Sequence, residues 1–230
     1  MTLSPEEWQA VVLSLSVAGR SVLLSLLPAI GMAWLLARGR FPGRTLLDAC
    51  VHLPLVVPPV VVGWGLLMLF GIQGPIGGLL QSWFGVRLVF TTEGAALATA
   101  VMSFPLIVRA VRLSLEGLDA GYEAAAQTLG AGPLDRFLTI TLPLMSPGIL
   151  AGTVTAFAAG LGEFGAVITF ASNIPGETQT LPLAIYSATQ TPGGEWVAAR
   201  LALVSFSLAI AGLLLAEVLS RRMQRLLGRV

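Results

Sequence analysis

The chain has 230 residues, of which 55% are hydrophobic and only 11% charged, and its mean hydropathy is +0.85. A soluble domain carries about 25% charged residues, so this composition excludes one and predicts a single multi-pass membrane domain covering residues 1–230. The net charge of +1 gives no field that would attract nucleic acid.

All 13 basic residues are arginine. A Walker A loop needs a lysine to contact nucleotide phosphates, so the chain is not a P-loop ATPase by itself, and any ATP must be bound by a partner subunit. The single cysteine, Cys50, excludes an internal disulfide, and the single histidine, His52, cannot assemble a metal site. We therefore expect no catalytic residue, metal or cofactor on this chain.

Five apolar segments are long enough to cross a membrane as helices. They are residues 11–37, 46–70, 94–111, 142–161 and 200–219. The residues before the first span carry Glu6 and Glu7 in place of a basic region, so we expect this span to remain as a helix and not to be cleaved as a signal peptide.

Arginine is concentrated after the odd-numbered spans. The residues are Arg38, Arg40, Arg44, Arg109, Arg112, Arg136, Arg221, Arg222, Arg225 and Arg229. By contrast, the loop 71–93 has only Arg87, and the loop 162–199 has no basic residue. Because arginine-rich loops stay in the cytoplasm, we expect the N-terminus outside, the C-terminus inside, and the loop 112–141 in the cytoplasm.

Proline interrupts the second span at Pro54, Pro58 and Pro59. Each proline removes a backbone donor, and in lipid such irregular backbone is tolerated only where protein or a water-filled cavity covers it. The prolines are either structural kinks or backbone that lines a pathway. Pro58 and Pro59 are the candidates for the second role.

The cytoplasmic loop contains a short predicted helix, residues 121–129, rich in good helix formers. Asp119 is its expected N-cap and Gly130 its C-terminal stop. A helix of this length needs a packing partner to be stable, and its alanines permit close approach to one. The loop therefore has the features of a docking element.

The spacing of Ala125, Ala126, Gly130, Ile140 and the pair Leu142-Pro143 resembles the cytoplasmic signature loop of permease subunits of bacterial ABC importers. The resemblance implies an all-α, type I ABC importer permease fold in which this loop forms a coupling helix seated on an ATPase subunit. The family's glutamate falls at Ala124, whereas here Glu123 stands one residue earlier, which turns the carboxylate about 100° around the helix. We therefore expect docking to depend on Ala125, Ala126 and Gly130 more than on the charge of Glu123.

Further motifs extend the resemblance to the oxyanion branch of these permeases. They are residues 52–59, 103–106, 109–113, 161–166, 172–178 and 190–195. The set looks most like molybdate permeases, with tungstate and sulfate or thiosulfate as alternative substrates. The resemblance implies a bacterial inner-membrane homodimer, two ATPase subunits and an external binding protein that delivers the oxyanion.

Glu163, with its neighbours Phe164 and Gly165, lies at the external end of the fourth span. An ionisable residue at membrane depth suggests a function, but a carboxylate repels an oxyanion. Glu163 is therefore either a gate residue or an interfacial, salt-bridged one.

Two functions of other classes remain as alternatives. A self-contained secondary transporter or channel predicts internal repeats and paired broken helices, which the sequence lacks. An intramembrane enzyme needs a nucleophile and a base, and Cys50 and His52 offer little toward such a site.

Overall fold

The structure is a computed structural model that describes residues 3–226, in which every regular element is helical. The predicted all-helical membrane fold is confirmed. The ends of the predicted domain, residues 1–2 and 227–230 with Arg229, lie outside the described residues. The elements are α1 (Pro5–Arg38), α2 (Arg44–His52), η1 (Leu53–Leu55), α3 (Pro59–Phe70), α4 (Pro75–Phe84), α5 (Thr92–Glu116), α6 (Ala120–Thr128), α7 (Pro133–Arg136), η2 (Phe137–Thr141), α8 (Leu142–Leu161), α9 (Gly165–Phe170), α10 (Leu181–Thr189) and α11 (Glu195–Leu226).

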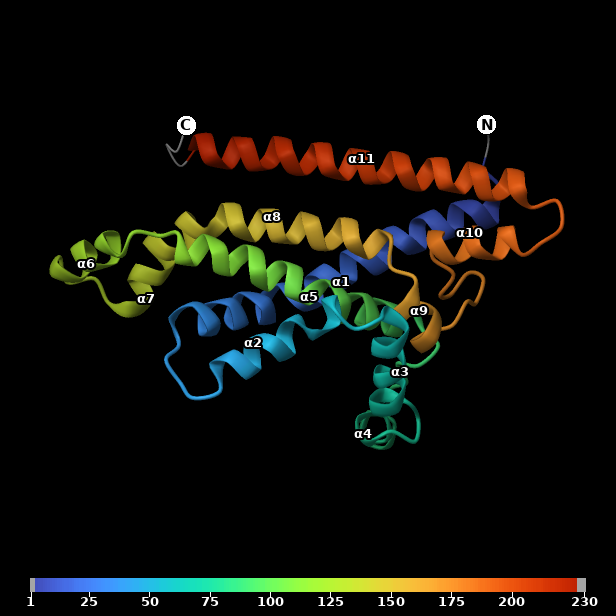
Figure 1. Cartoon of the computed structure of the whole chain (residues 1–230), viewed down its shortest axis with the longest axis horizontal. Helices are drawn as coiled ribbons and strands as arrows, with labels where there is room; N and C mark the ends of the chain where they lie inside the picture. The colour runs from blue at the N-terminus through green and yellow to red at the C-terminus, as the bar shows by residue number, and fades with distance from the viewer. Residues whose placement is uncertain (1–2, 227–230) are drawn as a thin grey trace.

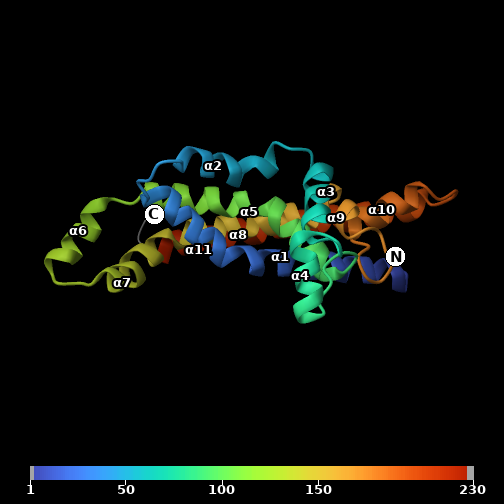
Figure 2. The same ribbon diagram turned by 90° about the horizontal axis from the view of Figure 1, so that it is seen from below.

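The long helices α1, α5, α8 and α11 lie side by side along the long axis of the molecule (Figure 1). The N-terminal end of the chain lies at one end of this bundle, and α6 and α7 project from the other (Figures 1 and 2). Small residues permit the close packing: on α1, Ala18, Ala29 and Ala33 are fully buried. A Cβ added at Gly152 of α8 would lie 3.1 Å from the Cα of Ile107 in α5. Such small-residue contacts are typical of helices packed within a membrane.

Four described helical stretches are long and apolar enough to cross a membrane, and a bent pair makes up to five. The helices are longer than the predicted spans: α1 and α5 extend beyond residues 11–37 and 94–111, and α11 begins five residues before position 200. Only α8 has the predicted bounds, 142–161. Polar helix ends that extend beyond the apolar core explain the difference.

The second span is not the continuous segment 46–70 that the sequence predicts. The stretch Arg44–Leu55 and α3 meet at an angle of 110°, with the break at residues 56–58. Pro58 caps α3 and Pro59 is its first residue, where a missing N–H costs nothing. In both views α3 therefore runs across the long axis (Figures 1 and 2).

The two external segments expected as loops contain helices. Residues 71–93 include α4, and residues 162–199 include α9 and α10. These helices are six to ten residues long, too short to be stable alone. Packing against the rest of the protein stabilises α9 and α10, because their side chains Phe170, Leu181 and Leu183 are among the most buried.

Candidate functional site: a coupling loop and a broken-helix constriction

The predicted coupling helix is present as α6, Ala120–Thr128. Asp119 is its N-cap, as expected, and its Oδ1 accepts a hydrogen bond from the N–H of Gly121 at 2.8 Å. Gly130 has φ +86°, a left-handed conformation that ends the helix. The N–H of Ala131 then bonds the carbonyl of Ala126 at 3.0 Å, which closes the helix end.

Large apolar side chains in and beside α6 are exposed. Tyr122 is 58% exposed, Leu129 88% and Leu134 70%. Of the predicted docking alanines, Ala125 is exposed and Ala126 is half-buried. A protruding end that exposes apolar side chains beside small residues has the chemistry of a protein-docking surface.

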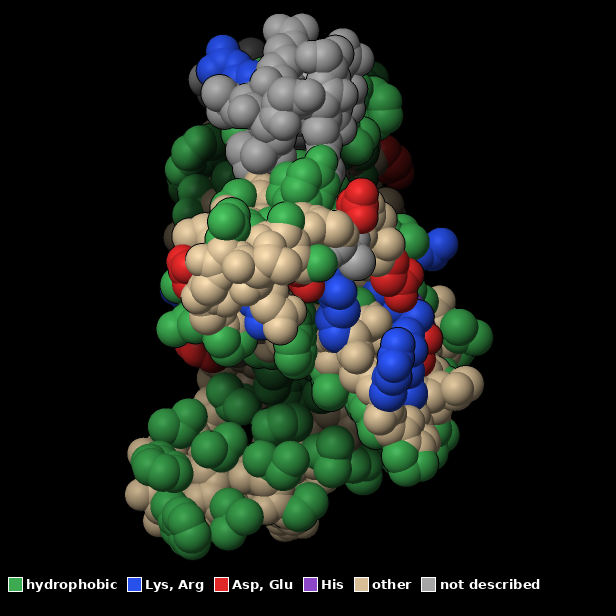
Figure 3. Space-filling view, turned by 90° about the vertical axis from the view of Figure 1, so that its left-hand side faces the viewer, with side chains coloured by type: hydrophobic (Ala, Val, Ile, Leu, Met, Phe, Trp, Pro, Cys, Tyr) green, Lys and Arg blue, Asp and Glu red, His purple; other side chains and the backbone are tan. Residues whose placement is uncertain are grey.

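Glu123 points back into the chain. Its Oε1 accepts a hydrogen bond from Arg38 Nη2 at 2.9 Å, and another from the hydroxyl of Thr141 at 2.9 Å. Arg38 is the last residue of α1, and Thr141 is the residue before α8. The carboxylate therefore fastens the coupling helix to two long helices, on the end of the molecule where charged side chains gather (Figure 3).

The predicted residues Ile140, Leu142 and Pro143 lie where the loop joins α8. Ile140 is in the π-helical segment η2, and Leu142 and Pro143 open α8. Ile140 and Leu142 are half-buried, whereas Pro143 is exposed. Ile140 and Leu142 thus connect the loop to the bundle and are not part of the exposed surface of the loop. A π-helical segment such as η2 is often found at a functional site.

The candidate gate residues Pro59 and Gly165 are in contact. A Cβ added at Gly165 would lie 2.8 Å from the Cβ of Pro59, and one added at Gly63 would lie 2.7 Å from the carbonyl oxygen of Ala166. Both glycines are buried. The start of α3 and helix α9 therefore meet backbone against backbone, as their adjacency in Figures 1 and 2 indicates. Pro58, the cap of α3, is exposed at this contact.

Glu163 and Phe164 form the turn between α8 and α9. Glu163 Oε1 accepts a hydrogen bond from the N–H of Ala166 at 2.9 Å, so it caps the short helix α9. Among the described residues Glu163 has no ion-pair partner. The ring of Phe164 packs edge-on against Tyr186, with 5.3 Å between the centroids.

The structure does not bring the gate candidates and the coupling loop together. Thr141 precedes α8 and Glu163 follows it, and the 20 residues of α8 separate them by about 30 Å. Any coupling between these two groups of residues is therefore carried by helices and not by direct contact.

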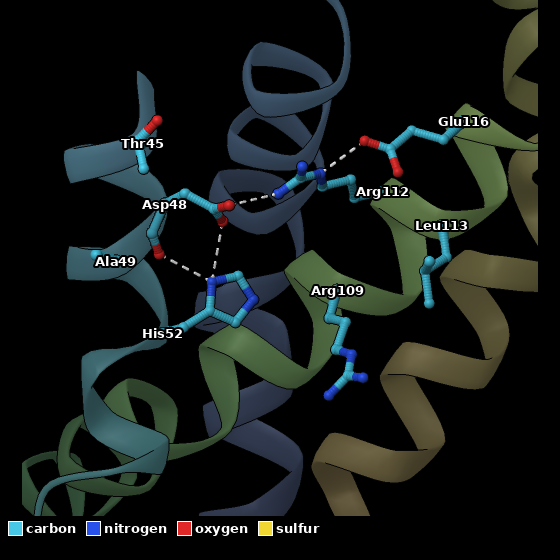
Figure 4. A pocket seen from close by; sticks show the side chains of 8 residues that line it. All are labelled: Thr45, Asp48, Ala49, His52, Arg109, Arg112, Leu113 and Glu116. Carbon is cyan, nitrogen blue, oxygen red and sulfur yellow. Dashed lines mark hydrogen bonds and ion pairs between the residues drawn. The ribbon is translucent and has the colours of Figure 1, made fainter. Parts of the chain in front are cut away.

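The structure contains an ion-pair network between α2 and α5 that the sequence did not predict (Figure 4). Arg112 Nη1 lies 2.8 Å from Asp48 Oδ2, and Arg112 Nε lies 2.8 Å from Glu116 Oε1. His52 Nδ1 lies 2.9 Å from the carbonyl oxygen of Asp48. The i, i+4 spacing of Arg112 and Glu116 could have indicated their ion pair from the sequence. The contact of Arg112 with Asp48, 64 residues away, has no such sequence signal.

Over the described part of the chain, no three His, Cys, Asp or Glu side chains are arranged to hold a metal ion. The structure thus combines a protruding end with exposed apolar side chains around α6, a close contact between α3 and α9, and the long helix α8 that runs from one to the other.

Comparison with known proteins agrees with this geometry. Residues 29–225 match the family described as binding-protein-dependent transport system inner membrane component. The chain is 58% identical to the molybdenum transport system permease protein ModB of Escherichia coli (strain K12), over 100% of both chains. It is 46% identical over 159 residues to the sulfate transport system permease protein CysT of Salmonella typhimurium, covering 69% of this chain and 57% of that one.

Among solved structures, the chain resembles a bacterial ABC transporter involved in the import of the acidic polysaccharide alginate. The TM-score is 0.76 at 18% identity, over 96% of this chain and 80% of that one. At this identity the similarity establishes the fold, which is that of ABC importer permeases. Since the family match covers most of the chain, the protein is a member of the binding-protein-dependent transport system inner membrane components.

Proposed function

We propose that this protein is the permease subunit of an ATP-driven molybdate importer. The observation that carries the proposal is 58% identity, over 100% of both chains, to a molybdenum transport permease. The sulfate permease is less similar, at 46% identity, and the match covers only 57% of its length. Tungstate, a tetrahedral dianion of nearly the same size, is expected to use the same pathway.

The family is one of inner-membrane transport components, so the chain moves a solute and does not catalyse a reaction. The match to a binding-protein-dependent family argues against a self-contained secondary transporter. ATP is bound by a separate ATPase subunit, in keeping with the absence of lysine from this sequence.

In the proposed assembly, two copies of the chain form the anion pathway between them, and two ATPase subunits bind the coupling helices. Most homo-oligomers are two-fold, and the exposed apolar side chains of α3, such as Val60 and Trp64, leave a surface for a second copy. The N-terminus is external, and α6 and the C-terminus are cytoplasmic. An external binding protein delivers the anion to the end that carries α10.

Coupling follows from the placement of α8. Closure of the ATPase subunits on ATP moves α6, and α8 transmits the movement to Glu163 and α9. The contact between Gly165 and Pro59 then opens or closes, because a backbone-to-backbone contact has two discrete packings and does not deform continuously. The pathway binds the anion weakly, since a deep charged site would hold the ion and not pass it on.

The test is uptake into vesicles that contain the permease, its ATPase and its binding protein. We expect ATP-dependent accumulation of labelled molybdate, competed by tungstate and weakly by sulfate. Accumulation of sulfate in preference to molybdate would make the chain a sulfate permease, and accumulation without ATP would contradict the coupled mechanism.

A further inference from the structure

A cavity of about 500 Å³ lies between α2 and α5, at the end of α5 that leads into the coupling helix. Its lining residues are Thr45, Asp48, Ala49, His52, Arg109, Arg112, Leu113 and Glu116. Because one water takes about 30 Å³ in the liquid, the cavity has room for a small hydrated ion. It adjoins the broken helix pair that carries Pro58 and Pro59.

The two carboxylates of the cavity are already neutralised. Arg112 contacts Asp48 and Glu116, each at 2.8 Å, and Arg44 Nη2 lies 4.0 Å from Glu116. Two arginines, Arg109 and Arg112, line the cavity with these two carboxylates, and counting Arg44, which lies outside the lining, gives three arginines to two carboxylates. The remaining positive charge belongs to Arg109.

Arg109 lies one turn before Arg112 on α5, and its side chain extends away from the ion pairs (Figure 4). Its side chain is exposed. Within residues 3–226 it has no carboxylate within 4.0 Å and no hydrogen-bond acceptor. Arg109 lines this cavity without a hydrogen-bond or ion-pair partner among the described side chains, so its guanidinium is available to an external anion.

We propose that this cavity binds a tetrahedral oxyanion, with the guanidinium of Arg109 as its main ligand. The planar guanidinium presents paired N–H donors in a geometry that matches two oxygens of such an anion. The inference rests on the proposed function, which supplies one source of the anion, the transported dianion near its release. The phosphate of a lipid headgroup at the cytoplasmic surface is the other source with the same chemistry.

The location suits a release step. An anion that passes the contact between Pro59 and Gly165 follows the broken pair toward α2 and reaches Arg109 there. One arginine beside neutralised carboxylates gives weak binding, as an exit position requires. The ion pairs of Arg112 with Asp48 and Glu116 reduce the repulsion between these carboxylates and the anion.

The experiment uses the permease–ATPase complex in vesicles of zwitterionic phosphatidylcholine, without the binding protein. Binding of labelled molybdate is measured for the native protein and for Arg109→Gln, Arg109→Lys and Arg40→Gln. The control, Arg40, is an exposed arginine outside the cavity and outside every ion pair of the described residues. Arg109→Gln is expected to weaken binding at least tenfold, Arg109→Lys less, and Arg40→Gln not at all.

A second arm uses vesicles that also contain anionic phosphatidylglycerol, and counts the anionic lipid that stays with the purified complex. If molybdate does not bind but Arg109→Gln lowers lipid retention, the headgroup phosphate is the ligand, and the oxyanion site stands. If Arg109→Gln alters neither molybdate binding nor lipid retention, the site is overturned. ATP-driven uptake by the native transporter, measured in parallel, tests the proposed function separately, because it does not depend on the outcome at Arg109.

Discussion

The carboxylate of Glu123 in the coupling helix is bonded to Arg38 at the end of α1, with 2.9 Å between Oε1 and Nη2. The same oxygen accepts the hydroxyl of Thr141, so a single side chain holds α6 against both α1 and the start of α8. Glu123 thus acts inside the permease. This agrees with the expectation that docking on the ATPase depends more on Ala125, Ala126 and Gly130, which remains a prediction.

Replacing Glu123 with alanine should reduce coupling without unfolding the protein. Partly exposed ion pairs contribute at most about 1 kcal/mol, so the transporter should still assemble and hydrolyse ATP. Molybdate transported per ATP should fall severalfold, because α6 is no longer fixed to α1 and α8. Arg38→Ala should have a similar effect, and the double variant should add little to either. Full additivity would show that the two side chains act separately.

Replacing Gly130 with leucine should uncouple ATP hydrolysis from uptake. The residue has φ +86°, and an L-residue there costs about 1–2 kcal/mol, which disfavours the turn that ends α6. Gly132→Ala is the matched control, because Gly132 has φ −68° and open space around it. The measurement is the ratio of uptake to ATP hydrolysis in vesicles. Equal ratios for the two variants would contradict the role assigned to the turn.

Replacing Gly63 or Gly165 with alanine should separate α3 from α9. The added methyl group would lie 2.7 Å from Ala166 O or 2.8 Å from Pro59 Cβ, closer than atoms approach without a shift. We expect transport to fall at least tenfold while the permease–ATPase complex still forms. Gly65→Ala, on the same helix with no atom within 4 Å, should transport normally. Normal transport by both Gly63→Ala and Gly165→Ala would show that this contact has no part in transport.

Replacing Glu163 with glutamine should alter gating more than assembly. In the native protein the N–H of Ala166 donates to Glu163 Oε1 at 2.9 Å. The amide oxygen of glutamine can accept the same hydrogen bond, so the first turn of α9 keeps it. Only the negative charge is removed. We expect a changed rate of ATP hydrolysis in the absence of binding protein, with unchanged recovery of the complex. A variant that fails to assemble would assign Glu163 a structural role instead.

The sequence predicted elements whose signals are local. The helix predicted over residues 121–129 is present as Ala120–Thr128, within one residue at each end, because Asp119 and Gly130 mark its ends through backbone chemistry. The bounds of α8 agree for a similar reason: Pro143 lies in its first turn, Gly162 is its C-cap, and no charged residue lies between them.

Features that depend on packing could not be predicted in the same way. Pro58 and Pro59 indicated an irregular second span, but the 110° angle follows from the contact of α3 with α9, about 100 residues further along the chain. Likewise, Glu123 could be placed on its helix, but Arg38 and Thr141, its partners, are distant in sequence. At the predicted gate, the contact between Pro59 and Gly165 has no signature in either segment alone.

The helical stretch Pro133–Leu161 is continuous over 29 residues, a length of about 44 Å at the rise of an α-helix. The coupling helix α6 precedes one end of this stretch, and α9 follows the other end. A tilt of about 5° at the cytoplasmic end would displace the far end by about 4 Å over this length. In the proposed mechanism this displacement is larger than the 2.7 Å that would separate a Cβ added at Gly63 from the carbonyl oxygen of Ala166. We therefore expect a small rotation imposed by the ATPase to be enough to change the packing of α3 against α9.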